Sequence, residues 1–187
     1  RNASVARAII AAVEAAVAVK RQNAVPVVPT KASEEEIGQI SALDAIDLSR
    51  TCERGVYKKE LAELQSELYD LTYKAYKKGI SSTILFEGWD AAGKGGAIRR
   101  LTAGIDARIT RVIPVSAPTD EELAHNYLWR FWRHIPRAGF VTIYDRSWYG
   151  RVLVERVEKL TQPEDWKRAY AELNDFEEQL QEHNNIL

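Results

Sequence analysis

The sequence predicts an α/β fold, a parallel sheet covered by helices on both faces, because short apolar runs alternate along the chain with segments of helical periodicity. Three runs have the length and the β-branched or aromatic content of buried strands: residues 82–87, 109–115 and 140–144. Helical spacing occurs between and after them, in residues 97–105, 119–134, 151–160 and 164–182. The last two residues, Ile186 and Leu187, resemble the start of a further strand.

A long helix is expected ahead of the first strand. From Tyr57 onward the apolar positions recur in steps of four and three residues, at Leu61, Leu64, Leu68, Leu71 and Ala75. The repeat is short, which favours a helix packed on a core over a coiled coil, and Gly79 is expected to end it. The same helix could serve an interface between copies of the chain, so a homo-oligomer is an open expectation.

Two later helices carry start signals. Thr119 with Glu122 forms the capping-box pattern, and the helix that it opens is expected to run to about His134. Thr161 with Glu164 repeats the pattern before the final helix.

The beginning of the chain differs from the rest in composition. Residues 1–22 are expected to form a helix, the tail of a preceding domain, because Val5, Ile9, Val13 and Val17 fall four apart. A signal peptide is the alternative, which Glu14 inside the apolar run disfavours. Two prolines and three consecutive glutamates make residues 23–40 a linker. The main domain then occupies residues 41–187.

Composition excludes several classes of protein. Of the 187 residues, 45% are hydrophobic and 28% charged, which suits a folded domain with a core and excludes a disordered chain. The single cysteine, Cys52, excludes a disulfide framework and fits a reducing compartment, so a cytoplasmic location is expected. The chain lacks an apolar run long enough for a transmembrane helix, and no membrane partner is expected. Because it contains no methionine, we expect it not to be a complete translation product.

The strongest local signal is a glycine-rich turn between a predicted strand and a predicted helix. Gly88, Gly93 and Lys94 match the pattern G-x-x-x-x-G-K of a phosphate-binding loop. Backbone N–H groups at the following helix start can hold phosphate oxygens, and Lys94 adds a positive charge. The alternative is a tight turn with a purely structural role.

Two features of this turn are unusual. Gly95 follows the lysine, where a Ser or Thr normally holds Mg²⁺. Asp90 lies inside the turn, where its carboxylate would compete with a phosphate unless a divalent cation bridges the two. We interpret Asp90 as a metal ligand or as the group that positions the accepting oxygen, with capping of the turn as the alternative.

A second acid ends the third predicted strand. Asp145 would lie at the carboxyl end of a parallel strand beside the glycine turn, the place of a Walker B aspartate that holds Mg²⁺. A strand-ending aspartate is also common as a helix cap, but the glycine turn favours the metal role.

Arginines accumulate around these motifs. From Lys94 to Arg151 the chain has ten basic residues, nine of them arginines, against five acidic ones. A substrate with many phosphates would need such a track, and ordinary surface charge is the alternative. Trp129, Trp132 and Trp148 could stack nucleic-acid bases, but core positions are favoured for all three.

Three segments resemble the second polyphosphate kinase family: GWDAAGKGGAIRRLTAGID, PTDEELAHNYLWRFWRHIP and VTIYDRSWYGRVLVERVE. They occur in the family's order, and the resemblance runs from about Tyr57 to Leu187. Within the family, the chain is most similar to tandem-domain polyphosphate:AMP phosphotransferases, in which an active domain follows a degenerate one. The resemblance implies a P-loop kinase-like three-layer α/β/α fold and Mg²⁺-dependent phosphoryl transfer from inorganic polyphosphate to a nucleotide, AMP before ADP or GDP.

The resemblance also implies roles for individual residues. Catalytic roles fall on Asp90, Lys94, Asp145, Arg133 and Arg146, and phosphate binding on Gly88, Gly93, Lys94, Gly95, Gly96 and Arg100. Asp90 and Asp145 would organise Mg²⁺. Family members continue beyond a segment like residues 176–187 into another strand and a basic lid, so the domain is expected to be incomplete and to turn over weakly alone. The alternatives are an ATP-dependent P-loop kinase of a small molecule and a polyanion-binding or nucleic-acid-binding module, and a nucleic-acid partner is not expected.

Overall fold

The computed structural model describes residues 7, 8, 10, 11, 14, 49 and 51–187. In chain order its elements are α2 (Arg54–Lys77), β1 (Ser81–Phe86), α3 (Lys94–Thr102), β2 (Thr110–Pro114), α4 (Asp120–Leu123), α5 (Trp129–Trp132), β3 (Val141–Asp145), η2 (Trp148–Arg151), α6 (Val154–Val157), α7 (Pro163–Glu182) and β4 (Asn185–Ile186). The expected linker over residues 23–40 lies outside the described residues, as does most of the expected helix over 1–22. Residues 7, 8, 10, 11 and 14 of that segment are helical, and its assignment to a preceding domain stays a prediction.

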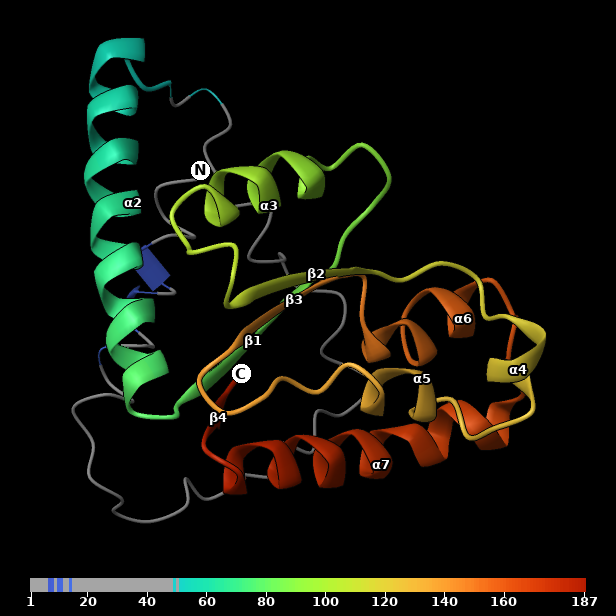
Figure 1. The fold of residues 1–187 in the computed structure, drawn as a ribbon. Coiled ribbons are helices and arrows are strands. Elements are labelled where there is room, and N and C mark those ends of the chain that lie inside the picture. Colours follow the sequence, from blue (N-terminus) through green and yellow to red (C-terminus); the bar gives the residue numbers. More distant parts are fainter. Residues whose placement is uncertain (1–6, 9, 12–13, 15–48, 50) are drawn as a thin grey trace, which may run out of the picture.

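The four strands form one parallel sheet in the order β2-β3-β1-β4. Because parallel strands cannot be joined by a tight hairpin, each connection between successive strands contains at least one helix. Figure 1 shows α2 and α3 on one side of the sheet and α5 and α7 on the other. The predicted three-layer α/β/α architecture with a parallel sheet is therefore confirmed.

Alternate residues of the central strands divide the interior into two cores. On β3, Val141 and Ile143 pack with α2 and α3, through residues such as Leu68 and Ile98. Tyr144, the next residue, packs on the other face among aromatic and aliphatic side chains of α5, η2 and α7: Phe131, Trp148, Leu173, Phe176 and Leu180. A sheet covered on both faces needs strands that are apolar on both sides, and this is why the predicted strands read as continuous apolar runs.

The long helix α2 is confirmed, with its buried positions at the predicted three- and four-residue spacing: Leu64, Leu68, Leu71 and Ala75. The Glu53 side chain caps its first turn by accepting from the Gly55 N–H. Gly79 ends it at a φ of 67°, and the N–H of Ile80 donates to the Ala75 carbonyl at 3.0 Å. Among the described residues, none of the helices has the length and apolarity needed to cross a membrane.

The prediction of a single helix over residues 119–134 is wrong. The capping box of Thr119 and Glu122 is present, but α4 ends at Leu123, and α5 begins only at Trp129. The Asn126 side chain accepts from the Leu128 N–H at 3.0 Å, while the Asn126 carbonyl accepts from Trp129. Asparagine thus replaces the helical hydrogen bonds with a local turn, which a period count does not detect.

Two other predicted helix details are corrected. Residues 151–160 form no continuous helix, because the chain passes through the 3₁₀ turn η2 and the single turn α6. Thr161 does not cap the final helix: α7 begins at Pro163 with Gln162 as its N-cap. The Thr161 hydroxyl accepts instead from Arg151 Nη1 at 2.7 Å, and proline at the first helical position sets the start.

Leu68 is 1% exposed at the centre of the first core, so removing its side chain tests whether this face holds α2 on the sheet. Leu68→Ala is expected to lower the free energy of unfolding by about 3 kcal/mol, measured by denaturant titration. The neighbouring Glu67 is exposed, and Glu67→Ala is expected to change stability by less than about 0.5 kcal/mol. Equal effects of the two substitutions would contradict the packing described here.

Candidate phosphate-binding site

The glycine turn connects the end of β1 to the start of α3. Gly93 is the N-cap of α3 at a φ of 92°, a left-handed conformation that glycine adopts without strain. No side chain caps this helix start. The first N–H groups of α3 are therefore available to an anion, in the manner expected of a phosphate-binding loop.

The register of the sheet brings the second acid to this turn. Asp145 at the end of β3 pairs with Phe86 of β1 on one side and with Pro114 of β2 on the other. The next residue, Arg146, donates its N–H to the Phe86 carbonyl at 2.9 Å. The segment that follows β3 therefore lies beside the glycine turn, as the sequence motifs predicted.

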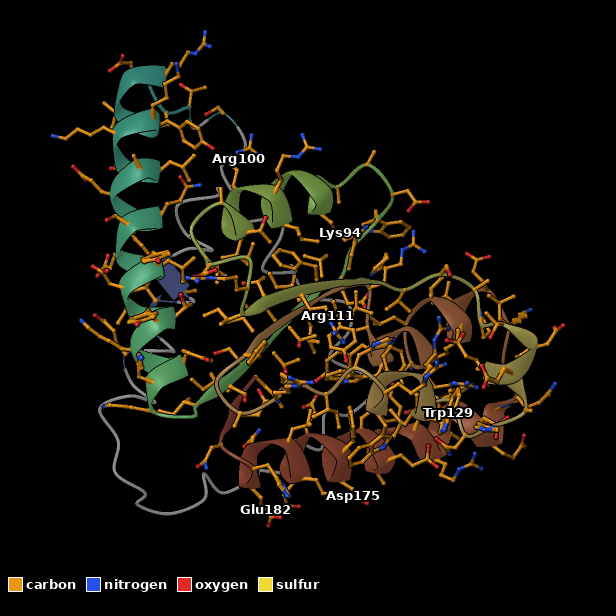
Figure 2. The ribbon with its side chains drawn as sticks, viewed as in Figure 1. Lys94, Arg100, Arg111, Trp129, Asp175 and Glu182 are labelled. Carbon is orange, nitrogen blue, oxygen red and sulfur yellow. The ribbon has the colours of Figure 1, made fainter. Side chains whose placement is uncertain are left out.

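A cavity of about 440 Å³ opens at this edge of the sheet. It is lined by the turn, the first turn of α3 and the ends of β2 and β3: Asp90, Ala91, Ala92, Gly93, Lys94, Gly95, Pro114, Val115, Ser116, Asp145 and Arg146. The structure thus brings together the two predicted metal-binding aspartates, the predicted lysine and one predicted arginine. Figure 2 shows Lys94 at the end of α3 that meets the turn.

Three charged side chains of the cavity, Asp90, Lys94 and Arg146, have partners within the protein. Arg146 forms an ion pair with Asp90, across the gap between the β3 end and the glycine turn. Lys94 Nζ donates to the carbonyls of Gly88 and Trp89, at 2.8 and 2.9 Å. The lysine ammonium is therefore held over the turn, close to the amides that would bind a phosphate.

Arg146 also has an unusual backbone, with a φ of 70°. Such a conformation is costly for a non-glycine residue and persists only where neighbouring contacts enforce it. Here the enforcing contacts come from β1 and from Glu87 after it. Glu87 Oε1 accepts from both the N–H and the hydroxyl of Ser147, each at 2.7 Å.

Sequence reasoning missed Glu87 and Ser147. Their positions next to strand ends were the one signal that could have indicated them. Glu87 directly follows β1, and Ser147 lies two residues past the end of β3. Because those strands are neighbours in the sheet, the two residues meet, but only the strand order shows it.

The segment after Arg146 is anchored on its other side by α7. Trp148 is 1% exposed, and its indole N–H donates to Glu177 Oε1 at 2.8 Å. The hydroxyl of Tyr149 donates to the same oxygen at 2.5 Å. Burial, together with this hydrogen bond to Glu177, raises the pKa of the Tyr149 phenol above its usual range. The expectation that Trp148 lies in the core is confirmed.

Most of the predicted arginine track does not line the cavity. Arg133, at the end of α5, lies 3.7 Å from Glu121 and stacks over the Trp129 ring at 4.7 Å. Arg100 lies toward the far end of α3 from Lys94, with Nη1 donating to the Gly96 carbonyl (Figure 2). Arg133 thus has an acidic partner outside the cavity, and Arg100 contacts the backbone of its own helix. The roles that the resemblance assigns to Arg133 and Arg100 stay predictions.

The donor set of the cavity suits a hard divalent cation. Asp90 and Asp145 supply carboxylate oxygens, and the part of the chain that the structure describes holds no cluster of three or more acidic, histidine or cysteine side chains. Mg²⁺ is often held by only one or two carboxylates, with phosphate oxygens and water completing its octahedron. The residues present therefore fit a magnesium ion that binds together with a phosphate substrate.

Comparison with known proteins bears on the family resemblance found in the sequence. The polyphosphate kinase 2 (PPK2) sequence profile matches residues 51–187. A polyphosphate:AMP phosphotransferase of Pseudomonas aeruginosa is 45% identical over 192 residues, which cover 100% of this chain and 38% of the relative. A polyphosphate:AMP phosphotransferase of Pseudomonas syringae is 54% identical over 140 residues, 75% of this chain and 28% of the relative. The chain therefore spans about a third of the length of these curated relatives.

The fold has a close counterpart among solved structures. A crystal structure described as a polyphosphate kinase 2 from Pseudomonas aeruginosa superimposes with a TM-score of 0.72 at 53% identity, covering 76% of this chain and 31% of the other. The sequence profile spans most of the chain, including both β1 with its glycine turn and β3 with Asp145. These matches confirm the resemblance found in the sequence: the chain belongs to the polyphosphate kinase 2 family.

Proposed function

We propose that the protein to which this chain belongs transfers a phosphoryl group from inorganic polyphosphate to a nucleotide, with AMP converted to ADP. The observation that carries the proposal is the joint presence of Asp90, Lys94 and Asp145 on one cavity at an uncapped helix start. The names of the two relatives support polyphosphate and AMP as the substrates. A cytoplasmic location and a homo-oligomer stay predictions from the sequence.

In the proposed mechanism the glycine turn binds the phosphates. The first amides of α3 donate to phosphate oxygens, and Lys94 places its ammonium beside them. Arg146, held beside the turn by its bond to Phe86, offers a guanidinium to the group in transfer. Preorganised donors of this kind stabilise the charge of the transition state more than that of the bound substrate.

Asp90 and Asp145 would hold the magnesium ion, which when bound neutralises negative charge on the phosphate oxygens. The Asp90 carboxylate would then exchange part of its present contact with Arg146 for the cation, which leaves that guanidinium available to substrate.

The chemistry needs no nucleophile from the protein. A phosphate oxygen of AMP forms the new P–O bond to the terminal phosphorus of polyphosphate, while the bridging P–O bond breaks and the shortened chain leaves with the electron pair. The protein holds the two substrates in line and stabilises the charge that spreads over the transferred group.

The first test uses the full protein with long-chain polyphosphate, Mg²⁺ and, in separate reactions, AMP, ADP or GDP, with products separated by chromatography. ADP formed from AMP without any ATP is the expected result. ADP or GDP as the preferred acceptor would replace the AMP assignment with that of another member of the same family. A requirement for ATP that polyphosphate cannot meet would contradict the proposal.

Two substitutions test the cavity itself. Lys94→Ala and Asp145→Asn are each expected to lower kcat at least about 100-fold. Lys94→Ala removes a positive charge beside the bound phosphates, and Asp145→Asn removes a carboxylate that would hold the magnesium ion. The matched control is Asp175→Asn: Asp175 is an exposed carboxylate on α7, on the other side of the sheet from α3 (Figure 2), and its loss is expected to leave kcat within twofold. Circular dichroism of each variant checks the fold. Full activity of Asp145→Asn would remove this acid from the mechanism.

Glu87 is expected to act as a positioning residue through Ser147. Glu87→Ala removes the oxygen that holds the Ser147 N–H and hydroxyl, so Arg146 loses a constraint on its strained backbone. We expect kcat to fall about tenfold, a typical effect for an indirect partner. Glu87→Gln keeps a carbonyl oxygen at this position and should restore most of kcat, whereas equal losses in both variants would indicate a role for the charge instead.

A further inference from the structure

Glu177 on α7 accepts two hydrogen bonds from the chain that follows Arg146. Its Oε1 accepts from the indole N–H of Trp148 at 2.8 Å and from the hydroxyl of Tyr149 at 2.5 Å. The helix α7 lies on the opposite side of the sheet from α3 (Figure 1). Glu177, Trp148 and Tyr149 line neither the phosphate cavity nor a second cavity, of about 460 Å³, that shares Asp90 and Arg146 with it. Glu177 thus belongs to the support of the site and not to its lining.

The Trp148 side chain is held so closely that its N–H depends on this acceptor. Trp148 is 1% exposed, and its ring packs edge to face on those of Tyr144 and Phe176, with ring centroids 5.3 and 4.9 Å apart. This packing orients the indole, and a buried N–H without an acceptor is costly. The Glu177 carboxylate and the packed rings therefore fix the position of Trp148 together.

Arg146 depends on a fixed chain after it because its own backbone, at a φ of 70°, is strained. The residue after it, Ser147, is bound to Glu87, and the two residues after Ser147 are bound to Glu177. The Ser147 hydroxyl also accepts from the N–H of Tyr149 at 3.3 Å, at the start of η2. A displacement of Tyr149 is therefore transmitted to Ser147, the direct neighbour of Arg146.

We propose that Glu177 is a positioning residue for phosphoryl transfer, which holds the Arg146 guanidinium at the phosphate cavity through Trp148 and Tyr149. The inference rests on the proposed function, in which Arg146 offers its guanidinium to the group in transfer. Without the Glu177 carboxylate, the segment after β3 keeps its contacts with the sheet but loses these two bonds to the helix layer. Arg146 then spends part of its time in conformations that do not face the transferred group, and the rate of transfer falls.

The first test compares variants of the full protein by kcat for phosphoryl transfer and by KM for both substrates. Glu177→Leu has no acceptor, and its kcat is expected to fall about tenfold while each KM stays within about twofold. Glu177→Gln keeps a carbonyl oxygen for both donors and should retain kcat within about threefold. Tyr149→Phe loses one of the two bonds and should lower kcat about threefold, which keeps the proposal testable if Glu177→Leu fails to fold.

A double-mutant cycle with Arg146→Gly separates positioning from stability. Glycine removes the guanidinium and adopts a φ of 70° without strain. In this background Glu177→Leu is expected to change kcat by less than about twofold, because the group that Glu177 positions is absent. An equal loss of kcat in both backgrounds overturns the proposal and indicates a structural role alone.

The matched control is Glu178→Leu. Glu178 is the next residue on α7, and it is exposed. This variant should retain kcat within about twofold, since surface substitutions away from such contacts have small effects. A loss of kcat as large as that of Glu177→Leu overturns the proposal.

Amide hydrogen exchange, followed by NMR, tests the same inference without the reaction. The Arg146 N–H donates to the Phe86 carbonyl at 2.9 Å, and the Val141 N–H, at the start of β3, donates to the Ile109 carbonyl at 2.8 Å. In Glu177→Leu, exchange at Arg146 should accelerate at least about fivefold more than exchange at Val141, because the loosening is local to the segment after β3. Equal acceleration of both amides overturns the proposal.

The two readouts also distinguish this inference from the proposed function. If the exchange pattern is as expected but polyphosphate donates no phosphoryl group, the donor is wrong, and the kcat cycle is then measured with ATP. If polyphosphate phosphorylates AMP and Glu177→Leu retains full kcat, the role of Glu177 fails alone.

Discussion

The site depends on one constraint, the parallel pairing of β1 with β3 in the register that places Phe86 opposite Asp145. This pairing aligns the ends of the two strands, so the glycine turn after β1 and the Arg146 segment after β3 leave the sheet side by side. A slip of one residue would move Ile143 and Tyr144 to the wrong faces. Both side chains are fully buried, in different cores, and this fixes the register.

The same pairing explains why a strained residue is stable at the centre of the site. Arg146 adopts a positive φ because its N–H is bound to Phe86 and the following Ser147 is bound to Glu87. Beyond Ser147, Trp148 and Tyr149 share one oxygen of Glu177 on α7. The segment after β3 is thus held from the sheet and from the helix layer, which keeps Asp145 and Arg146 in a defined position at the edge of the cavity.

Asp90 and Arg146 form the boundary between two cavities of different chemistry. On one side lie backbone amides and a lysine, and on the other lie valines, a leucine and an exposed tryptophan. The ion pair of Arg146 with Asp90 lies at this boundary.

By itself, the sequence determined the features that depend on short stretches of chain. The spacing of Leu64, Leu68 and Leu71 defines α2, the glycine pattern defines the turn before α3, and the capping box of Thr119 is present as predicted. Each rests on periodicity or on contacts between residues close in sequence. The family resemblance added a prediction of which side chains carry the chemistry, and four of these, Asp90, Lys94, Asp145 and Arg146, line one cavity.

Only the tertiary structure decided which hydrogen-bond or ion-pair partner each polar side chain has. Thr161 binds Arg151 instead of capping α7, Arg133 pairs with Glu121 away from the cavity, and Glu87 meets Ser147 across two strands. A second cavity is likewise lined by residues of the glycine turn and of α6, among them Trp89, Val154 and Val157, that no local pattern connects. The physical reason is that a polar side chain forms hydrogen bonds or ion pairs with whichever group the packed sheet and helices bring within reach. Which groups come within reach depends on the whole fold.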